Sequence, residues 1–200
     1  MKKTLLTLTA ALWISLTASH ALEVENLRSE YRVNPVGIDA AKPRLSWEIL
    51  DDERGQRQSA YQILVASTPE ILAKDQGDLW DSGKVEGDRS IQVEYSGKPL
   101  VSGAECHWKV RVWEEKPETG NLKPEKEMVT AWSKPAQFVT GKMKPKDWQV
   151  QWIGASEDPK HAAVYLQKKV AVEKPVVRAT VFFCGLGFSE LAIDGKKVGD

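Results

Sequence analysis

The stretch Cys106–Trp113 reads CHWKVRVW and places an apolar residue at every second position from Cys106 to Val112. Because successive side chains of a β-strand point to opposite faces of its sheet, this period of two predicts a strand with one buried face. The predicted buried face consists of Cys106, Trp108, Val110 and Val112. The predicted outward face consists of His107, Lys109, Arg111 and Trp113.

Turn residues divide the rest of residues 22–141 into further short apolar runs, which suit strands better than helices. The predicted strands are residues 43–50, 61–67, 79–85, 90–95, 105–114 and 131–140. Within Thr68–Lys74, a threonine at the N-cap position and proline at the first helical position predict one or two helical turns. The pattern predicts an all-β domain, a fibronectin type III or immunoglobulin-like β-sandwich with Trp47 in its core.

Residues 142–147 are rich in lysine and proline and are interpreted as a short linker. Beyond it, residues 164–172, 176–184 and 188–193 are strand candidates, and Asp194-Gly195 predicts a two-residue hairpin turn. The returning arm has only a few residues, which is too little to complete a sheet. We therefore expect residues 148–200 to be the truncated start of a second β domain.

Residues 1–21 have the features of a secretory signal peptide, namely Lys2 and Lys3, an apolar middle and the small residues Ser19 and Ala21 before the cleavage point. Removing them leaves 26 basic against 28 acidic residues, a net charge of −2. This charge disfavours a nucleic-acid binder, and no later stretch approaches the roughly 20 apolar residues of a membrane span. We expect a periplasmic or secreted protein with no membrane anchor after cleavage and no nucleic-acid partner.

The two cysteines, Cys106 and Cys184, lie in apolar runs of the two different predicted domains. We expect two separately buried free thiols, because free cysteine is among the most buried residue types. Neither the cysteines nor His20, His107 and His161 have the spacing of a zinc site.

Four further patterns resemble functional sites but do not have the features that such sites require. Asp51-Asp52-Glu53 on a turn should point into solvent, and Asp75, Asp78 and Asp81 lack the loop of an EF-hand. Cys106 and His107 are neighbours on one strand, so they should face opposite ways. Gly185-Leu186-Gly187 precedes a predicted strand, whereas a phosphate-binding glycine loop precedes a helix. We therefore predict no catalytic residue, no cofactor and no metal site.

The outward face of Cys106–Trp113 is the remaining candidate, with Trp132 expected on the neighbouring strand. Aromatic rings beside guanidinium groups can hold a sugar ring or a partner surface. More often such residues stack on one another, at about 0.5 to 1 kcal/mol for each exposed cation–π contact. We favour the structural stack, hereafter the cation–π ladder.

Several segments together resemble the N-terminal region of bacterial α-L-rhamnosidases, in order and at similar spacing. They are Asn34–Asp39, Pro43–Trp47, Arg54–Val65, Leu79–Val85, Trp108–Trp113, Trp132–Ala136 and Gln151–Gly154. The resemblance implies a fibronectin-like sandwich, then a jelly-roll-like β domain that includes the hairpin at Leu191–Asp200. It also implies a later (α/α)6 barrel that hydrolyses terminal α-L-rhamnosides with inversion through two carboxyl groups.

Nothing in the 200 residues corresponds to that barrel, so the resemblance assigns no catalytic residue. The chain departs from fibronectin-like domains at Cys106 and His107, where a tyrosine usually fixes a corner of the sandwich. We expect a non-catalytic N-terminal portion of a secreted α-L-rhamnosidase, with rhamnose-containing glycans as partners of the missing domains. The alternatives are a free-standing carbohydrate-binding or protein-interaction sandwich, and the front of another secreted hydrolase such as a sialidase or a purple acid phosphatase.

Overall fold

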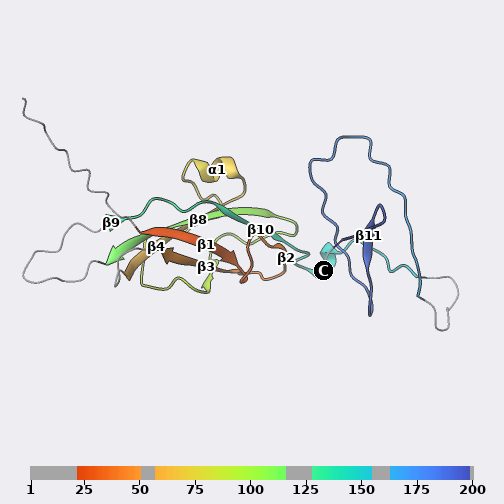
Figure 1. Cartoon of the computed structure of the whole chain (residues 1–200), viewed down its shortest axis with the longest axis horizontal. Coiled ribbons are helices and arrows are strands. Elements are labelled where there is room, and N and C mark those ends of the chain that lie inside the picture. The colour runs from red at the N-terminus through yellow and green to blue at the C-terminus, as the bar shows by residue number, and fades with distance from the viewer. Residues whose placement is uncertain (1–21, 51–56, 116–127, 155–162, 199–200) are drawn as a thin grey trace, which may run out of the picture.

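Two sheets, antiparallel except for β2, pack face to face in the computed structural model, which describes residues 22–50, 57–115, 128–154 and 163–198 (Figure 1). The smaller sheet has the order β1 (Glu23–Ser29), β3 (Arg44–Leu50), β7 (Val93–Glu94). The larger sheet has the order β2 (Val36–Ile38), β10 (Ala136–Thr140), β8 (Glu105–Glu115), β4 (Arg57–Ala66), β5 (Trp80–Asp81). Two further short strands extend it, β6 (Val85–Glu86) beside β4 and β9 (Met128–Val129) beside β8. The predicted all-β sandwich is confirmed.

The long pair β4 and β8 forms the centre of the larger sheet, in a register that places Val65 opposite Trp108 and Ile63 opposite Val110. The period of two in both strands directs these side chains into the space between the sheets. Trp47 from β3 enters the same space from the other side, and both tryptophans are buried as predicted. Trp47 Nε1 donates to Gln58 Oε1 at 3.1 Å, so this core indole is hydrogen-bonded.

Four predicted strands are clearly shorter than expected, three in the sandwich and one at residues 188–193, of which only 191–193 form a strand. Residues 79–85 divide into β5 and β6, and residues 90–95 contribute only β7. Residues 131–140 contribute only β10, because residues 130–133 bind β8 through side chains as well as backbone. Val112 N donates to Thr130 Oγ1 and Val110 N to Ser133 Oγ, each at 3.1 Å. These hydroxyl groups accept hydrogen bonds that backbone carbonyls would accept in a regular β-sheet. The alternation of apolar residues in the sequence does not reveal this substitution.

Besides the two-residue strand β9, the sequence did not predict β1 or β2. The strand β1 contains a bulge between Glu25 and Arg28, where Asn26 has φ +52°, so its side chains do not alternate regularly. The strand β2 has only three residues and pairs in parallel with β10. Both segments carry too short or too irregular a pattern to be recognised.

A tyrosine does fix a corner of the sandwich, but it is Tyr95, which follows β7. Its hydroxyl donates to the carbonyl oxygen of Lys98 at 2.8 Å, and that of Leu79 lies 3.2 Å away. Burial, with smaller contributions from Cys106 and Asp78, raises the pKa of Tyr95 to about 12. A tyrosine corner bond is therefore made from a different position in the sequence, directly after β7.

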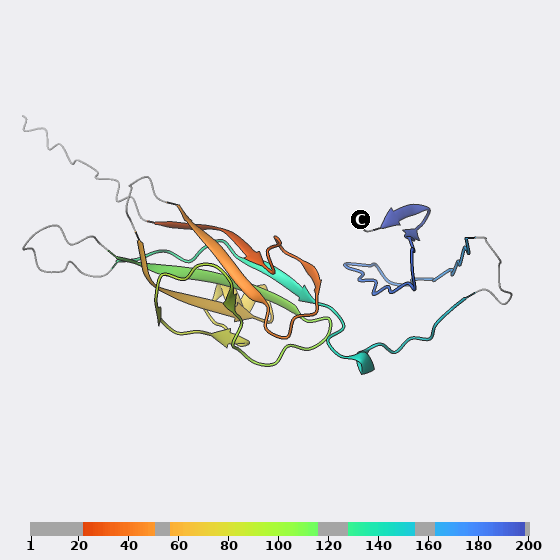
Figure 2. The same cartoon turned by 90° about the horizontal axis from the view of Figure 1, so that it is seen from below.

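Residues after the short helical turn η1 (Pro145–Asp147) lie beyond one end of the sandwich (Figure 2). The predicted hairpin is confirmed as β11 (Leu191–Ile193) and β12 (Lys196–Val198), with φ +50° at Asp194 and +75° at Gly195. The strands predicted at 164–172 and 176–184 are wrong for this structure, because neither has a strand beside it to complete its backbone hydrogen bonds. Cys184 is exposed rather than buried, while Cys106 is buried as expected.

Candidate functional site

The outer face of the larger sheet is covered by the short helix α1 (Pro69–Ala73) and by Trp132. Thr68 caps this helix, since its side chain accepts from Ile71 N at 3.3 Å, and Pro69 occupies its first turn. Leu72 then packs on Leu64 and Ala66, which face outward from β4, with Ile71 and Trp132 around them. The helix predicted at Thr68–Lys74 thus closes a second, smaller apolar cluster. Figure 1 shows α1 lying over the outer face of the larger sheet.

The cation–π ladder runs along this face as predicted, except that Trp132 lies in the irregular segment between β9 and β10 and not on a strand. Arg111 lies 4.5 Å from the ring centre of Trp132 and 5.2 Å from that of Trp113. Lys109 lies 5.1 Å from Trp132. Lys84, which the sequence did not indicate, lies 5.3 Å from Trp113 and adds a fourth contact.

Hydrogen bonds hold the ladder in one arrangement. Arg111 donates from Nε and Nη2 to Gln62 Oε1, at 3.0 and 2.7 Å. Gln62 Nε2 in turn donates to Asp81 Oδ1 at 2.7 Å. Lys109 is 6 % exposed and forms an ion pair with Asp75, so this cation is outward-facing but covered. The ring faces are engaged by cations that are themselves fixed, and this supports the structural interpretation of the ladder.

The three aspartates weighed as a calcium site have separate partners. Asp75 binds Lys109, and Asp81 accepts from Gln62 Nε2 and from Gly83 N. Asp78 accepts from Ser67 N at 2.8 Å and from Ser67 Oγ at 2.7 Å. Burial of Asp78 favours its neutral form, but these hydrogen bonds outweigh it and the pKa of Asp78 is lowered.

Cys106 and His107 point to opposite faces of β8, as predicted. Cys106 has no exposed surface, and burial raises the pKa of its thiol to about 12. His107 Nε2 lies 3.9 Å from Glu105 Oε1. A neutral, enclosed thiol has no base within reach and does not serve as a nucleophile.

The remaining sequence candidates yield no site either. Asp51-Asp52-Glu53 lies outside the described residues, and Leu186 and Gly187 form an exposed bend rather than a loop before a helix. The described ranges contain no group of three side chains able to hold a metal ion. They also contain no helix long and apolar enough to cross a membrane.

The described carboxyl groups with displaced pKa values are all shifted downward. Hydrogen bonds from Arg44 lower the pKa of Glu30, and a hydrogen bond from Ser102 lowers that of Asp147. For Glu70 the pKa is lowered by a hydrogen bond from its own backbone N–H and by one from the Thr68 side chain. A general acid for glycoside hydrolysis needs the opposite, a pKa raised toward neutrality.

The fold and its surface define an immunoglobulin-type β-sandwich whose outer face carries a hydrogen-bonded cation–π ladder. A model of the Rha78A-like N-terminal immunoglobulin domain matches residues 24–144. The chain belongs to this family of rhamnosidase N-terminal domains.

Relatives and solved structures agree with this assignment. An α-L-rhamnosidase of Formosa agariphila is 32% identical and aligns with 90% of this chain and 20% of its own length. The Streptomyces avermitilis α-L-rhamnosidase solved with L-rhamnose is 41% identical, with a TM-score of 0.59 over 68% of this chain and 12% of that one. The Dictyoglumus thermophilum α-L-rhamnosidase structure is 32% identical, with a TM-score of 0.60 over 68% of this chain and 14% of that one. The chain thus spans a fifth or less of these proteins.

Proposed function

We propose that this chain is the non-catalytic N-terminal portion of a secreted α-L-rhamnosidase. The carrying observation is the match itself, since the chain aligns over most of its length with proteins of that name but with only a small part of each. The signal-like residues 1–21 support export to the periplasm or beyond.

The hydrogen-bond partners of the described carboxyl groups support a non-catalytic role for the sandwich. Inverting hydrolysis needs an acid and a base held far enough apart to admit a water molecule. Glu30 is hydrogen-bonded to Arg44, Asp78 to Ser67, and Asp75 to Lys109, so these carboxylates are engaged in holding loops and strands together. The reaction then belongs to another part of the protein, and rhamnose-containing glycans would bind there.

The role we assign to the sandwich is support. Its two sheets, the second apolar cluster and the cation–π ladder cover the central strands on both faces, as suits a supporting body. A rigid body beside a catalytic module can hold that module in place without touching substrate.

Hydrolysis of an aryl α-L-rhamnoside tests the proposal. The gene is sequenced beyond the codon for Asp200, and the 200-residue chain and the longer product are assayed side by side. We expect turnover by the longer product and none by the 200-residue chain, because the described residues provide no acid and base pair. Turnover by the short chain alone, or a longer product without an in-frame glycosidase module, would contradict the proposal.

A binding experiment distinguishes the alternative of a free-standing carbohydrate-binding module. Titration calorimetry of the chain with L-rhamnose and with rhamnose-containing oligosaccharides should show no heat of binding if the sandwich only supports. Binding that Trp113→Ala removes would favour the alternative.

A further inference from the structure

The segment interpreted as a linker is held against the sandwich. Ser102, in the loop before β8, accepts from Met143 N at 2.8 Å and donates from its Oγ to Asp147 Oδ2. The same carboxylate oxygen accepts from Lys144 N at 3.1 Å. Pro145 opens the helical turn η1, and Asp147 N closes it on the carbonyl of Lys144 at 2.9 Å. Residues 142–147 are therefore a fixed bend, closed through Ser102 and Asp147.

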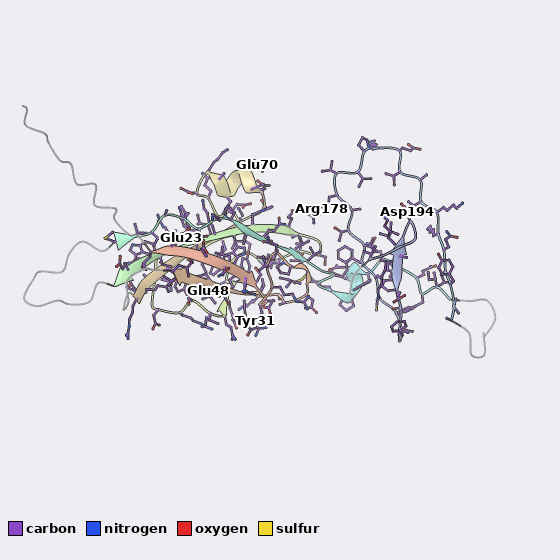
Figure 3. The ribbon with its side chains drawn as sticks, in the orientation of Figure 1. Glu23, Tyr31, Glu48, Glu70, Arg178 and Asp194 are labelled. Carbon is purple, nitrogen blue, oxygen red and sulfur yellow. The ribbon has the colours of Figure 1, made fainter. Side chains whose placement is uncertain are left out.

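The chain returns to the same end of the sandwich further on. Arg178 Nη1 forms an ion pair with Glu105 Oε2, at the first residue of β8. Lys142 Nζ lies 4.7 Å from the ring centre of Phe182. Figure 3 labels Arg178 between the sandwich and the hairpin that contains Asp194. Residues 178–182 thus make two contacts with this end of the sandwich, one with Lys142 in the bend and one with Glu105 at the start of β8.

A hollow lies between the bend and Phe182. It is lined by Ser102, Lys142, Asp147, Trp148 and Phe182, and by the exposed residues Gln149 and Val150. The aromatic rings of Trp148 and Phe182 therefore lie at the same junction as the hydrogen bonds that close the bend. Interfaces between domains of one chain are typically more polar than permanent interfaces, and this junction combines hydrogen bonds with aromatic contacts.

We propose that the end of the sandwich formed by Ser102, Glu105 and Lys142 is a docking surface for residues 178–182, and that it fixes how the following β domain leaves the sandwich. This proposal goes beyond the rhamnosidase assignment and does not depend on which reaction the longer protein performs.

Weak contacts are sufficient for this purpose. The side chains of Arg178 and Glu105 are 44% and 39% exposed, so their ion pair alone contributes little to stability. Because the bend already holds the two parts together, docking is intramolecular, at an effective concentration of the order of millimolar. The opposite charges of Arg178 and Glu105 and the contact of Phe182 with Lys142 then mainly set the orientation of the docked segment. They add little to the strength of docking.

Spin labels measure this orientation directly, and the chain offers a convenient site. Cys184 is exposed and lies two residues after Phe182, whereas Cys106 is buried and unreactive. The second label is placed on Lys74→Cys, an exposed position after α1. Double electron–electron resonance then gives the distance distribution between the sandwich and the docked segment. We expect a narrow peak for the chain that carries only Lys74→Cys.

Charge reversal supplies the test. In the Lys74→Cys background, Arg178→Glu should abolish the narrow peak, and adding Glu105→Arg should restore it. Ser102→Ala should abolish it through the bend. Lys174→Glu makes a similar change of charge at an exposed position away from the contacts and should leave the peak unchanged.

Tryptophan fluorescence and thermal unfolding of each variant check that the sandwich is intact, so that a lost peak is not mistaken for unfolding. A broad distribution before any substitution, or an Arg178→Glu peak as narrow as the original, would overturn the proposal. Failure here leaves the rhamnosidase assignment standing, since that assignment is tested by activity of the longer product.

Discussion

At the level of single residues, the two core tryptophans are held differently. Trp47 Nε1 donates to Gln58, and Gln58 Nε2 donates to the carbonyl of Gly87 at 3.0 Å. Trp108 is fully buried, but no described residue accepts from its Nε1. An unpaired buried donor carries a cost, so the contribution of Trp108 is the volume and apolar area of its ring.

Trp108→Ala should therefore destabilise the sandwich by about 3 to 5 kcal/mol, close to the whole stability of an ordinary domain. Trp113→Ala should cost far less, because Trp113 lies on the outer face between Lys84 and Arg111. Urea unfolding followed by circular dichroism measures both. Equal shifts of the two midpoints would show that the register of β8 is wrong. Trp108→Phe, which keeps an aromatic ring and loses no hydrogen bond, should fall between them.

The two thiols should differ sharply in reactivity. The thiolate is the reactive form, and burial with a pKa of about 12 keeps Cys106 neutral and enclosed at pH 8. Titration with a thiol-reactive dye should modify Cys184 in the folded chain and Cys106 only after unfolding. In Cys184→Ser the fast phase should disappear. Two thiols reacting at one rate in native buffer would contradict the structure.

Tyr95 should make the sandwich sensitive to alkali. Its pKa is raised from 10.0 to about 12, so folding favours the neutral phenol. The stability that this provides is fully present below pH 10 and is lost as the pH rises through 12. Tyr95→Phe should lower the unfolding free energy at pH 8 by about 1 kcal/mol, through loss of the bond to Lys98. The variant should also lose less stability between pH 10 and 12, and an unchanged slope would contradict this assignment.

At the level of elements, α1 stabilises the sheet that it covers, although it has little over one turn. Its cap brings Leu72 onto Leu64 and Ala66. Thr68→Ala removes the hydroxyl that accepts from Ile71 N and should cost about 1 kcal/mol, measured as a shift of the urea midpoint. Thr68→Ser keeps the hydroxyl and should cost less. If both variants behave alike, the helix end is held by packing and not by its cap.

The sequence predicted those elements whose signal is local. The period of two located β8 and most of β4, Thr68 and Pro69 located α1, and Asp194-Gly195 located the hairpin. The segment at residues 130–133 could not be predicted, because Thr130 and Ser133 bond to β8 through hydroxyl groups.

The cation–π ladder was predicted in part for the same reason. His107, Lys109, Arg111 and Trp113 share one face of a single strand, which the sequence period shows. Gln62 and Lys84 come from other segments, and only the register between β4 and β8 brings Gln62 opposite Arg111. The contacts of residues 178–182 with Glu105 and Lys142 join residues far apart in the sequence, so no local sequence pattern could predict them.

At the level of the whole molecule, apolar burial is concentrated before the bend. The two hydrophobic clusters use residues between Leu22 and Phe138, whereas large apolar side chains beyond residue 150 are mostly exposed. Since burial of apolar surface is the main stabilising contribution, the sandwich should keep its structure without help from residues 148–200. Residues 148–200 bury little apolar surface, so we do not expect them to keep their structure without the sandwich.

Limited digestion with trypsin should show this difference in one experiment. Lys168 and Lys169 are exposed in a stretch without a paired backbone, so cuts there should precede any cut within β4 or β8. Arg178 should be cut later than these two lysines because it is paired with Glu105, and Arg178→Lys with Glu105→Gln should remove that delay. Mass spectrometry of the fragments gives the order of cleavage. A protected fragment that extends from the sandwich to Asp200 would instead show that the second region is folded as firmly as the first.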